Sequence, residues 1–435
     1  MRKYRAFPFI ILLIVGLLGA FLNYNYSSSP GGGPISPADV AWLLTATGLV
    51  LLMTPGLSYF YGGMVSSKNI ISTMLQSFLA MGLISIVWIV VGFSLAFGDS
   101  IGGVIGNPLT FFMFRGVNGN TNAMLAPTIP LLLFAMFQLK FAIITPALIT
   151  GAFAERIRFS AYLLFMILFS LFIYAPLAHW TWHPDGFLKN LGVLDFAGGT
   201  VVHMSAGFAA LAGAHLLGRR HSHLAQKKHV PSNIPYVMLG TGLLWFGWFG
   251  FNAGSAMGAN ESAALAFATT NTASAAAMLA WIFLDVLLGR KPSALGACVG
   301  AVVGLVAITP AAGYVSIGAS IFIGVTASVI SNYAVNLKAR ISLDDTLDVF
   351  PCHGLGGIVG MILTSVFADK VGLIHGHIHT FLVHLLGLVI VGVFTFGGSF
   401  LLYKVTNFFI PLRVTQEQES AGLDISQHGE SIIRY

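Results

Sequence analysis

The sequence predicts an all-α membrane protein: eleven transmembrane helices built from two inverted five-helix repeats plus a final helix, with the N-terminus outside and the C-terminus inside. Three observations support this prediction: an apolar composition, a series of long uncharged runs, and a motif that recurs five helices apart. Of the 435 residues, 56% are hydrophobic and 8% are charged, whereas a soluble chain carries about 25% charged residues. This composition excludes a soluble enzyme, a disulfide-stapled secreted module and a disordered regulator.

Apolar runs long enough to cross a bilayer, about 17 to 25 residues, follow one another along the chain. Several are rich in Gly, Ala, Ser and Thr, small residues that let helix backbones approach closely in lipid. The two cysteines, Cys298 and Cys352, lie within such runs, so neither a disulfide framework nor a cysteine metal site is expected. The predicted spans are 40–63, 71–97, 129–154, 159–178, 196–218, 233–255, 262–288, 292–309, 314–336, 349–368 and 378–403.

The Lys and Arg residues of the short loops set the orientation. If the first of the eleven helices enters from outside, fourteen of them fall inside and three outside, and cytoplasmic loops carry the excess of positive charge in membrane proteins. The chain then divides into residues 1–34, a transmembrane domain over 35–410 and a cytoplasmic regulatory tail over 411–435. The inner residues are Lys68, Arg156, Arg158, Arg219, Arg220, Lys227, Lys228, Arg290, Lys291, Lys338, Arg340, Lys404, Arg413 and Arg434, and the outer ones are Arg115, Lys189 and Lys370.

Residues 1–34 resemble a signal peptide followed by a linker. A basic start at residues 2–5 precedes the apolar stretch from Phe7 to Leu22, and a polar stretch from Ser27 to Pro34 follows. The positions that fit a cleavage site are poor, Ala20 being the best of them. We expect the segment to be removed, with an uncleaved extra helix as the alternative; either outcome leaves residue 35 outside.

Two runs that begin with aspartate and end with histidine are the main candidates for chemistry. Asp195 precedes His203 by eight residues at the fifth span, and Asp345 precedes His353 by eight at the tenth. Five helices separate the runs, so the two helices are antiparallel, as in an inverted repeat whose site lies near mid-membrane. Eight residues at 1.5 Å each carry each histidine roughly 12 Å inward, so the two imidazoles nearly meet in a core about 30 Å thick.

Neutral imidazoles in apolar surroundings can accept a proton, share it or pass it on. The simplest alternative is two separate core histidines with structural hydrogen bonds. A metal site is a second alternative, but no carboxylate or cysteine completes a ligand set. A bis-histidine haem site is a third, and the lack of further mid-membrane histidines argues against an electron-transfer chain.

At these residues the sequence resembles the ammonium transporter family, which comprises Amt, Mep and Rhesus-type proteins. The run from Asp195 to His203, continuing to Gly218-Arg219-Arg220, is similar to the signature of the family's fifth helix. The resemblance extends from about residue 38 to the C-terminus. Supporting runs are Phe137-Gln138 with Phe141, Gly151 to Arg156, Ala178 to Trp182, Gly247 to Ser255, Asp348-Val349-Phe350 with His353-Gly354, Gly422 to Asp424, His428 to Glu430, and Tyr435.

The resemblance implies a transmembrane transporter or channel for ammonium in the cell (inner) membrane, a homotrimer with one pore per subunit. It implies a PII-type signal protein as a partner at the cytoplasmic tail, and neither enzymatic activity nor a cofactor. The implied site consists of a recruitment site formed by Trp182, Phe141 and Ser255, a gate of stacked Phe141 and Phe251, the pair His203 and His353 below it, and Asp195 as a structural and electrostatic support.

Physical chemistry agrees with this assignment. The face of Trp182 or Phe141 attracts a small cation, and the hydroxyl of Ser255 can accept a hydrogen bond from it. Ammonium differs from potassium in that it can lose a proton. The predicted mechanism is that ammonium binds outside and gives up its proton, ammonia passes an apolar constriction, and the histidines relay the proton or orient the molecule. Alternatives are a Rhesus-type neutral gas channel, an ammonium sensor on the same scaffold and a haem redox protein.

A few residues fall outside this pattern. Lys140, next to Phe141, is a charge in the middle of the third span, where an uncharged residue is expected; it can snorkel or pair elsewhere. His375, His377 and His379 alternate in an outer loop, where a solvated loop is favoured over a weak metal site.

Overall fold

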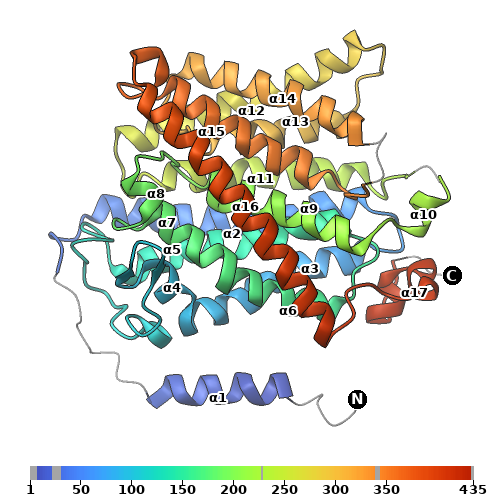
Figure 1. The fold of residues 1–435 in the computed structure, drawn as a ribbon, viewed down its shortest axis with the longest axis horizontal. Helices are drawn as coiled ribbons and strands as arrows, with labels where there is room; N and C mark the ends of the chain where they lie inside the picture. Colours follow the sequence, from blue (N-terminus) through green and yellow to red (C-terminus); the bar gives the residue numbers. More distant parts are fainter. Residues whose placement is uncertain (1–6, 22–30, 227–228, 339–342, 433–435) are drawn as a thin grey trace.

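The protein is a bundle of long helices in the computed structural model, which describes residues 7–21, 31–226, 229–338 and 343–432. Figure 1 shows the helices lying side by side, with α16 running diagonally across the front of the bundle. The helices that build the bundle are α2 (Pro37–Met64), α3 (Ile70–Val87), α5 (Leu131–Ile149), α6 (Phe159–Phe169), α7 (Ala175–Trp182), α9 (Ser205–Leu217), α11 (Ile234–Gly254), α12 (Glu261–Leu287), α13 (Ala294–Ile308), α14 (Ile317–Lys338), α15 (Leu355–Phe367) and α16 (Ile378–Phe409).

Shorter elements extend or connect these helices. Five turns are π-helical: η2 (Trp88–Gly92), η5 (Ser170–Tyr174), η6 (Gly199–Met204), η7 (Phe350–Gly354) and η9 (Asp424–His428). Three are 3₁₀ turns: η3 (Phe112–Phe114), η4 (Thr150–Phe153) and η8 (Leu373–His375). The rest are α1 (Phe7–Phe21), α4 (Phe93–Phe97), α8 (Phe187–Asn190), α10 (His221–Leu224), α17 (Gln416–Ala421) and the two antiparallel strands β1 (Ser100–Ile101) and β2 (Ile105–Gly106).

The described residues contain ten helical segments long and apolar enough to cross a membrane, and the shorter apolar helix α13 lies where an eleventh was predicted. Two predicted ends were wrong. The span predicted to end at residue 178 continues as α7 to Trp182, because His179 is buried and its Nδ1 bonds the Ala96 carbonyl (2.9 Å). The final helix runs to Phe409 rather than 403, since Lys404 lies among apolar residues whose pattern continues past it.

Hydrogen bonds between loops sort the helix ends onto two faces. On one face, which we call the tail-side face, Ser66 N donates to Glu155 Oε1 and Arg158 N to the Leu412 carbonyl. This face comprises residues 65–69, 154–158, 218–226, 229–233, 343–349 and 410–432. On the opposite face, Ser36 N donates to Thr128 O. We call it the cavity-side face, after the cavity that opens there and is described below. Figure 1 shows α10 and α17 together at one end of the bundle and α8 at the other.

Small residues bring the helices into contact, as the composition predicts. A Cβ on Gly240 of α11 would lie 2.3 Å from the backbone nitrogen of Phe60 in α2, so only glycine permits this crossing. A Cβ on Gly207 of α9 would likewise lie 2.3 Å from the backbone of Gly354. Close backbone approach of this kind supplies the van der Waals contact that holds helices together in lipid.

The N-terminal prediction is only partly covered by the structure. Residues 7–21 form α1, whose apolar side chains are largely exposed. Residues 2–5, residues 27–30 of the linker, Lys227, Lys228, Arg340, Arg434 and Tyr435 lie outside the described residues. Removal of the segment therefore stays a prediction.

Candidate functional site

A cavity of about 480 Å³ opens on the cavity-side face. The predicted recruitment residues Trp182, Phe141 and Ser255 all line it, although they come from α7, α5 and the residue that follows α11. Asp195 lies in its wall as well. The remaining lining residues are Phe97, Met124, Leu125, Phe134, Gln138, Thr181, Pro184, Lys189, Gly192, Val193, Leu194, Phe196, Met257 and Tyr314.

Hydrogen bonds fix the polar groups of Trp182 and Ser255. The indole Nε1 of Trp182 donates to the Asp195 carbonyl (3.2 Å), so the ring is held in one plane. The Ser255 hydroxyl donates to the Phe251 carbonyl (2.8 Å). Its single proton is thereby used, and the oxygen keeps its lone pairs for a donor in the cavity. This arrangement suits a small cation that carries N–H groups.

Phe141 and Phe251 close the cavity toward the middle of the bundle. Their ring centroids lie 4.2 Å apart with the planes tilted by 35°, and both side chains are buried. Phe141 also meets Trp182 edge to face, with centroids 5.7 Å apart. The contact between the two phenylalanine rings leaves an apolar constriction without polar groups to replace a hydration shell.

His203 and His353 lie directly behind this constriction, on the two π-helical turns η6 and η7. Their Nδ1 atoms are 3.4 Å apart, and both residues are buried. The His203 ring is 6.1 Å from Phe251, centroid to centroid, and stacks on Trp248 at 5.3 Å. The two rings therefore meet as the matching eight-residue spacings predict.

The hydrogen bond between the two histidines gives the two rings different roles. One neutral ring donates through Nδ1–H and the other accepts at Nδ1, so the first presents an acceptor Nε2 and the second a donor Nε2–H. His203 Nε2 is buried and has no hydrogen-bond partner among the residues that the structure describes. A proton taken up at one Nε2, passed across the Nδ1 contact and released from the other Nε2 moves the pair from one arrangement to the reverse.

A second, much smaller cavity continues beyond the histidines. Its volume is about 10 Å³, and His353, Tyr61 and Cys352 are among its lining residues. That volume corresponds to about one water-sized molecule. Its other walls are Phe60, Val299, Val302 and Leu347, so the space fits a small neutral molecule better than a hydrated ion.

The two aspartates of the motifs cap the two π-helical turns. Asp195 accepts from the backbone nitrogens of Gly198, Gly199 and Thr200, each at 2.7 Å, and from the Thr200 hydroxyl at 2.5 Å. Asp345 accepts in the same way from the nitrogens of residues 349 (3.1 Å) and 350 (2.8 Å). Each carboxylate thus satisfies the free N–H groups at the start of the turn that carries a histidine.

Two residues of the site were not singled out from the sequence. Trp248 stacks on His203 and fixes its own ring by donating to the Thr309 hydroxyl (2.9 Å); it stood in a quoted run, but nothing in the run assigns it to the histidines. Lys189 lies on the cavity wall and donates to the Trp182 carbonyl (3.4 Å). In the sequence, Lys189 indicates only the orientation of the chain, and nothing there predicts a positive charge near the cation site.

Lys140 and the three histidines of residues 375–379 do not line the cavity. Lys140, which was expected to snorkel or to pair elsewhere, is buried within α5. His375 lies 4.0 Å from Asp369, while His377 and His379 are exposed. Among the residues that the structure describes, no group of three or more His, Cys, Asp or Glu side chains could hold a metal.

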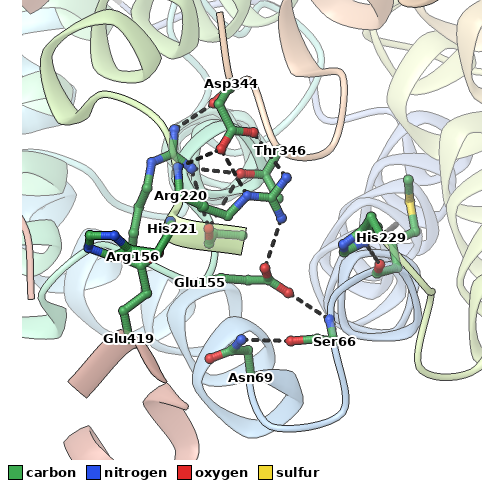
Figure 2. A network of polar contacts seen from close by, with 12 residues as sticks. Ser66, Asn69, Glu155, Arg156, Arg220, His221, His229, Asp344, Thr346 and Glu419 are labelled. Carbon is green, nitrogen blue, oxygen red and sulfur yellow. Dashed lines mark hydrogen bonds and ion pairs between the residues drawn. The ribbon is translucent and has the colours of Figure 1, made fainter. Parts of the chain in front are cut away.

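A buried ionic network joins the loops of the tail-side face (Figure 2). Arg220 binds Glu155 (2.8 Å) and Asp344 (2.9 Å), while Arg156 binds the Thr346 hydroxyl (2.7 Å). Burial alone would raise the pKa of the Asp344 carboxyl, but the hydrogen bonds from Arg220 and the charge of Arg156 hold that pKa well below its usual range. The network connects the loop after α5, the loop after α9 and the segment before η7.

The C-terminal segment docks on the same face. Glu419 accepts from His221 N (2.6 Å) and from the Arg413 guanidinium (2.8 Å). Asp424 accepts from Ser72 N at the start of α3 (2.7 Å), and Lys68 donates to the Ser420 carbonyl (2.6 Å). The segment is thus bound to loops at the ends of α2 and α9.

Known proteins are similar to this chain in both sequence and architecture. The family model described as Ammonium Transporter Family matches residues 41–433. An ammonium transporter of Aquifex aeolicus is 47% identical over 422 residues, covering 95% of this chain and 97% of the relative. The structure of Saccharomyces cerevisiae Mep2 has a TM-score of 0.82 at 34% identity, covering 88% of each chain, and that of a sensor Amt protein has a TM-score of 0.83 at 30% identity, covering 90% and 98%. The chain therefore belongs to the ammonium transporter family and is a multi-pass membrane protein.

Proposed function

We propose that this protein recruits ammonium at the cavity, deprotonates it and conducts ammonia through the apolar constriction past His203 and His353. The observation that carries the proposal is the unbroken aromatic series from Trp182 through Phe141 and Phe251 to the histidine pair. The wide cavity accepts a cation through ring faces and a hydroxyl oxygen. The space beyond the constriction is about one small molecule in size.

Selection against potassium follows from the same geometry. A potassium ion that enters the constriction loses its water and gains neither carbonyl rings nor carboxylates in return. Ammonium avoids this penalty because it can give up its proton and enter the constriction as neutral ammonia. The histidine pair supplies an acceptor and a donor inside the apolar core, and it therefore relays a proton or orients ammonia.

In the membrane, we propose eleven spans in two inverted five-helix repeats plus α16, with the tail-side face in the cytoplasm of an inner cell membrane. The excess of Lys and Arg on the predicted cytoplasmic side supports this orientation. Support for the repeat comes from the paired capping aspartates, the paired π-helical turns and the approach of Gly207 to Gly354.

On the evidence of the resemblance, we further propose a homotrimer in which a PII-type signal protein binds the tail-side face. The docked tail, held by Glu419 and Asp424, gives such a partner a structured surface. Native mass spectrometry of the purified protein, with and without the signal protein, tests both statements. A monomer, or an absence of added mass, contradicts them.

Current recording on membranes that contain the purified protein tests the transport proposal. If the histidines relay the proton, ammonium and methylammonium give currents and potassium and sodium give none. If the histidines only orient ammonia, labelled methylammonium is taken up without a current. A potassium response as large as the ammonium response would contradict the mechanism. The structural likeness to a sensor Amt protein makes a sensor the second candidate, which predicts ammonium binding with neither current nor uptake of labelled methylammonium.

A further inference from the structure

We propose that His384 of α16 is a positioning residue for the ammonium recruitment site, although it does not line the cavity. It holds the backbone at Leu194 and Asp195, to which the indole of Trp182 is bound. This inference rests on the proposed function, because it concerns the affinity of the site for the cation.

The contacts of His384 define its chemical form. The side chain is fully buried, its Nε2 lies 2.9 Å from the backbone nitrogen of Leu194, and its Nδ1 lies 2.9 Å from the Met361 carbonyl. A backbone N–H only donates and a carbonyl only accepts. The ring must therefore be neutral, with its proton on Nδ1, and both nitrogens are used.

The segment held by His384 is itself part of the cavity wall. Val193, Leu194 and Asp195 all line the cavity. A second contact with α16 lies one turn farther on, where a Cβ on Gly387 would be 3.2 Å from Val193 Cγ2. The segment before η6 is thus fastened to α16 by a hydrogen bond and by close packing.

The position of the Trp182 indole depends on these two contacts between the segment and α16. Its Nε1 donates to the Asp195 carbonyl at 3.2 Å, one residue after the nitrogen that His384 binds. If His384 loses its acceptor, the Leu194 N–H becomes a buried donor without a partner, which is unfavourable. The segment then shifts to find one, and the indole moves with it.

The positions of His203 and His353 change little when this segment shifts. The carboxylate of Asp195 is held by nitrogens of residues 198 to 200 at the start of η6, and these bonds keep the turn in place while the Leu194 backbone and the Asp195 carbonyl, which precede it, shift. His384 therefore affects cation binding at the cavity more than passage beyond it. This separates a positioning role from a general contribution to folding, which would lower the amount of active protein and leave the half-saturating concentration unchanged.

Three variants test the proposal in transport assays on reconstituted protein. His384→Leu removes both hydrogen bonds, and we expect the half-saturating ammonium concentration to rise about fivefold, with the maximal rate per folded protein within about twofold. His384→Gln, whose amide has an acceptor and a donor, is expected to stay within about twofold of the parent protein. His379→Leu, an exposed histidine of the same helix, is the matched control and changes neither value.

An unchanged half-saturating concentration in His384→Leu overturns the inference, as does a His384→Gln variant as impaired as His384→Leu. If His384→Leu does not fold, His384→Asn takes its place, since the shorter amide cannot reach both Leu194 and Met361. A raised half-saturating concentration in His384→Asn supports the role, and a parent-like value rejects it.

Hydrogen exchange of the peptide that spans residues 193–200, measured without substrate, separates this inference from the transport proposal. We expect faster exchange at Leu194 in His384→Leu and parent-like exchange in His384→Gln. If the parent protein carries no ammonium, the proposed function fails, while the exchange data still judge the hydrogen bond. Unchanged exchange in His384→Leu removes the physical basis of the inference.

Discussion

His203 and His353 stand 150 residues apart in the sequence, yet their Nδ1 atoms lie 3.4 Å from each other in the core of the bundle. Each sits on a π-helical turn, and each turn is capped by an aspartate eight residues before its histidine. The contact joins two segments whose backbones cross at Gly207 and Gly354. The pair thus depends on glycine at the crossing as much as on the histidines themselves.

Replacing either imidazole should interrupt proton transfer across the pair. We expect His203→Ala and His353→Ala to lower ammonium-dependent current, or the preference for ammonium over potassium, by about a hundredfold, the low end of general acid–base effects. His377→Ala, at an exposed position, serves as the control. Equal effects of all three variants would remove the twin-histidine mechanism.

Removing the ring face at the outer site should weaken cation binding. We expect Trp182→Leu to raise the half-saturating ammonium concentration about tenfold, because a desolvated cation–π contact contributes up to about 2 kcal/mol. Ser255→Ala removes one acceptor and should raise it about threefold. Phe172→Leu, at an exposed aromatic residue of η5, should leave it unchanged; a comparable rise there argues for a general effect on the fold.

Lys189 should oppose ammonium electrostatically. It lies on the cavity wall and binds the Trp182 carbonyl, so its positive charge repels an incoming cation. Lys189→Met is expected to lower the half-saturating ammonium concentration by about two- to threefold at 10 mM ionic strength, and the difference should shrink at 150 mM, where exposed charges are screened. Lys370→Met, in the loop that follows α15, is the comparison. A salt-independent effect would mean that Lys189 acts through packing.

The tail-side network should dominate stability in acid. Arg220 and Arg156 lower the pKa of Asp344 despite its burial, so the stabilisation is fully present above the usual Asp value near 3.9 and is lost as the pH falls below it. Asp344→Asn should reduce the free energy of unfolding at pH 7 by about 3 to 5 kcal/mol. Thermal unfolding in detergent between pH 2 and 7 measures the loss at pH 7 and the onset of the acid effect below pH 4.

Asp369→Asn is the matched control for this substitution, since Asp369 is 72% exposed beside His375. Its melting temperature should equal that of the parent protein at every pH. An acid transition of the parent that remains unchanged in Asp344→Asn would assign the loss of stability to other carboxylates.

Local sequence was sufficient for the helices because each is a largely apolar run with few charges, and hydrocarbon allows few conformations besides a helix. The exceptions are informative. His179 ended a predicted span too early, because its hydrogen bond to Ala96 comes from another helix and leaves no trace in the local pattern. For the same reason the local sequence gives no signal for His384, because its partners Leu194 and Met361 are 190 and 23 residues away.

Composition and apolar runs were enough to predict the helical membrane architecture, and the equal spacings from Asp195 to His203 and from Asp345 to His353 indicated that the two histidines meet. The surroundings of the two histidines depend on tertiary packing. Trp248 stacking on His203, Lys189 on the cavity wall and the ionic network around Arg220 all join residues from different helices. Periodicity and spacing describe one segment at a time, whereas these contacts depend on how several segments pack.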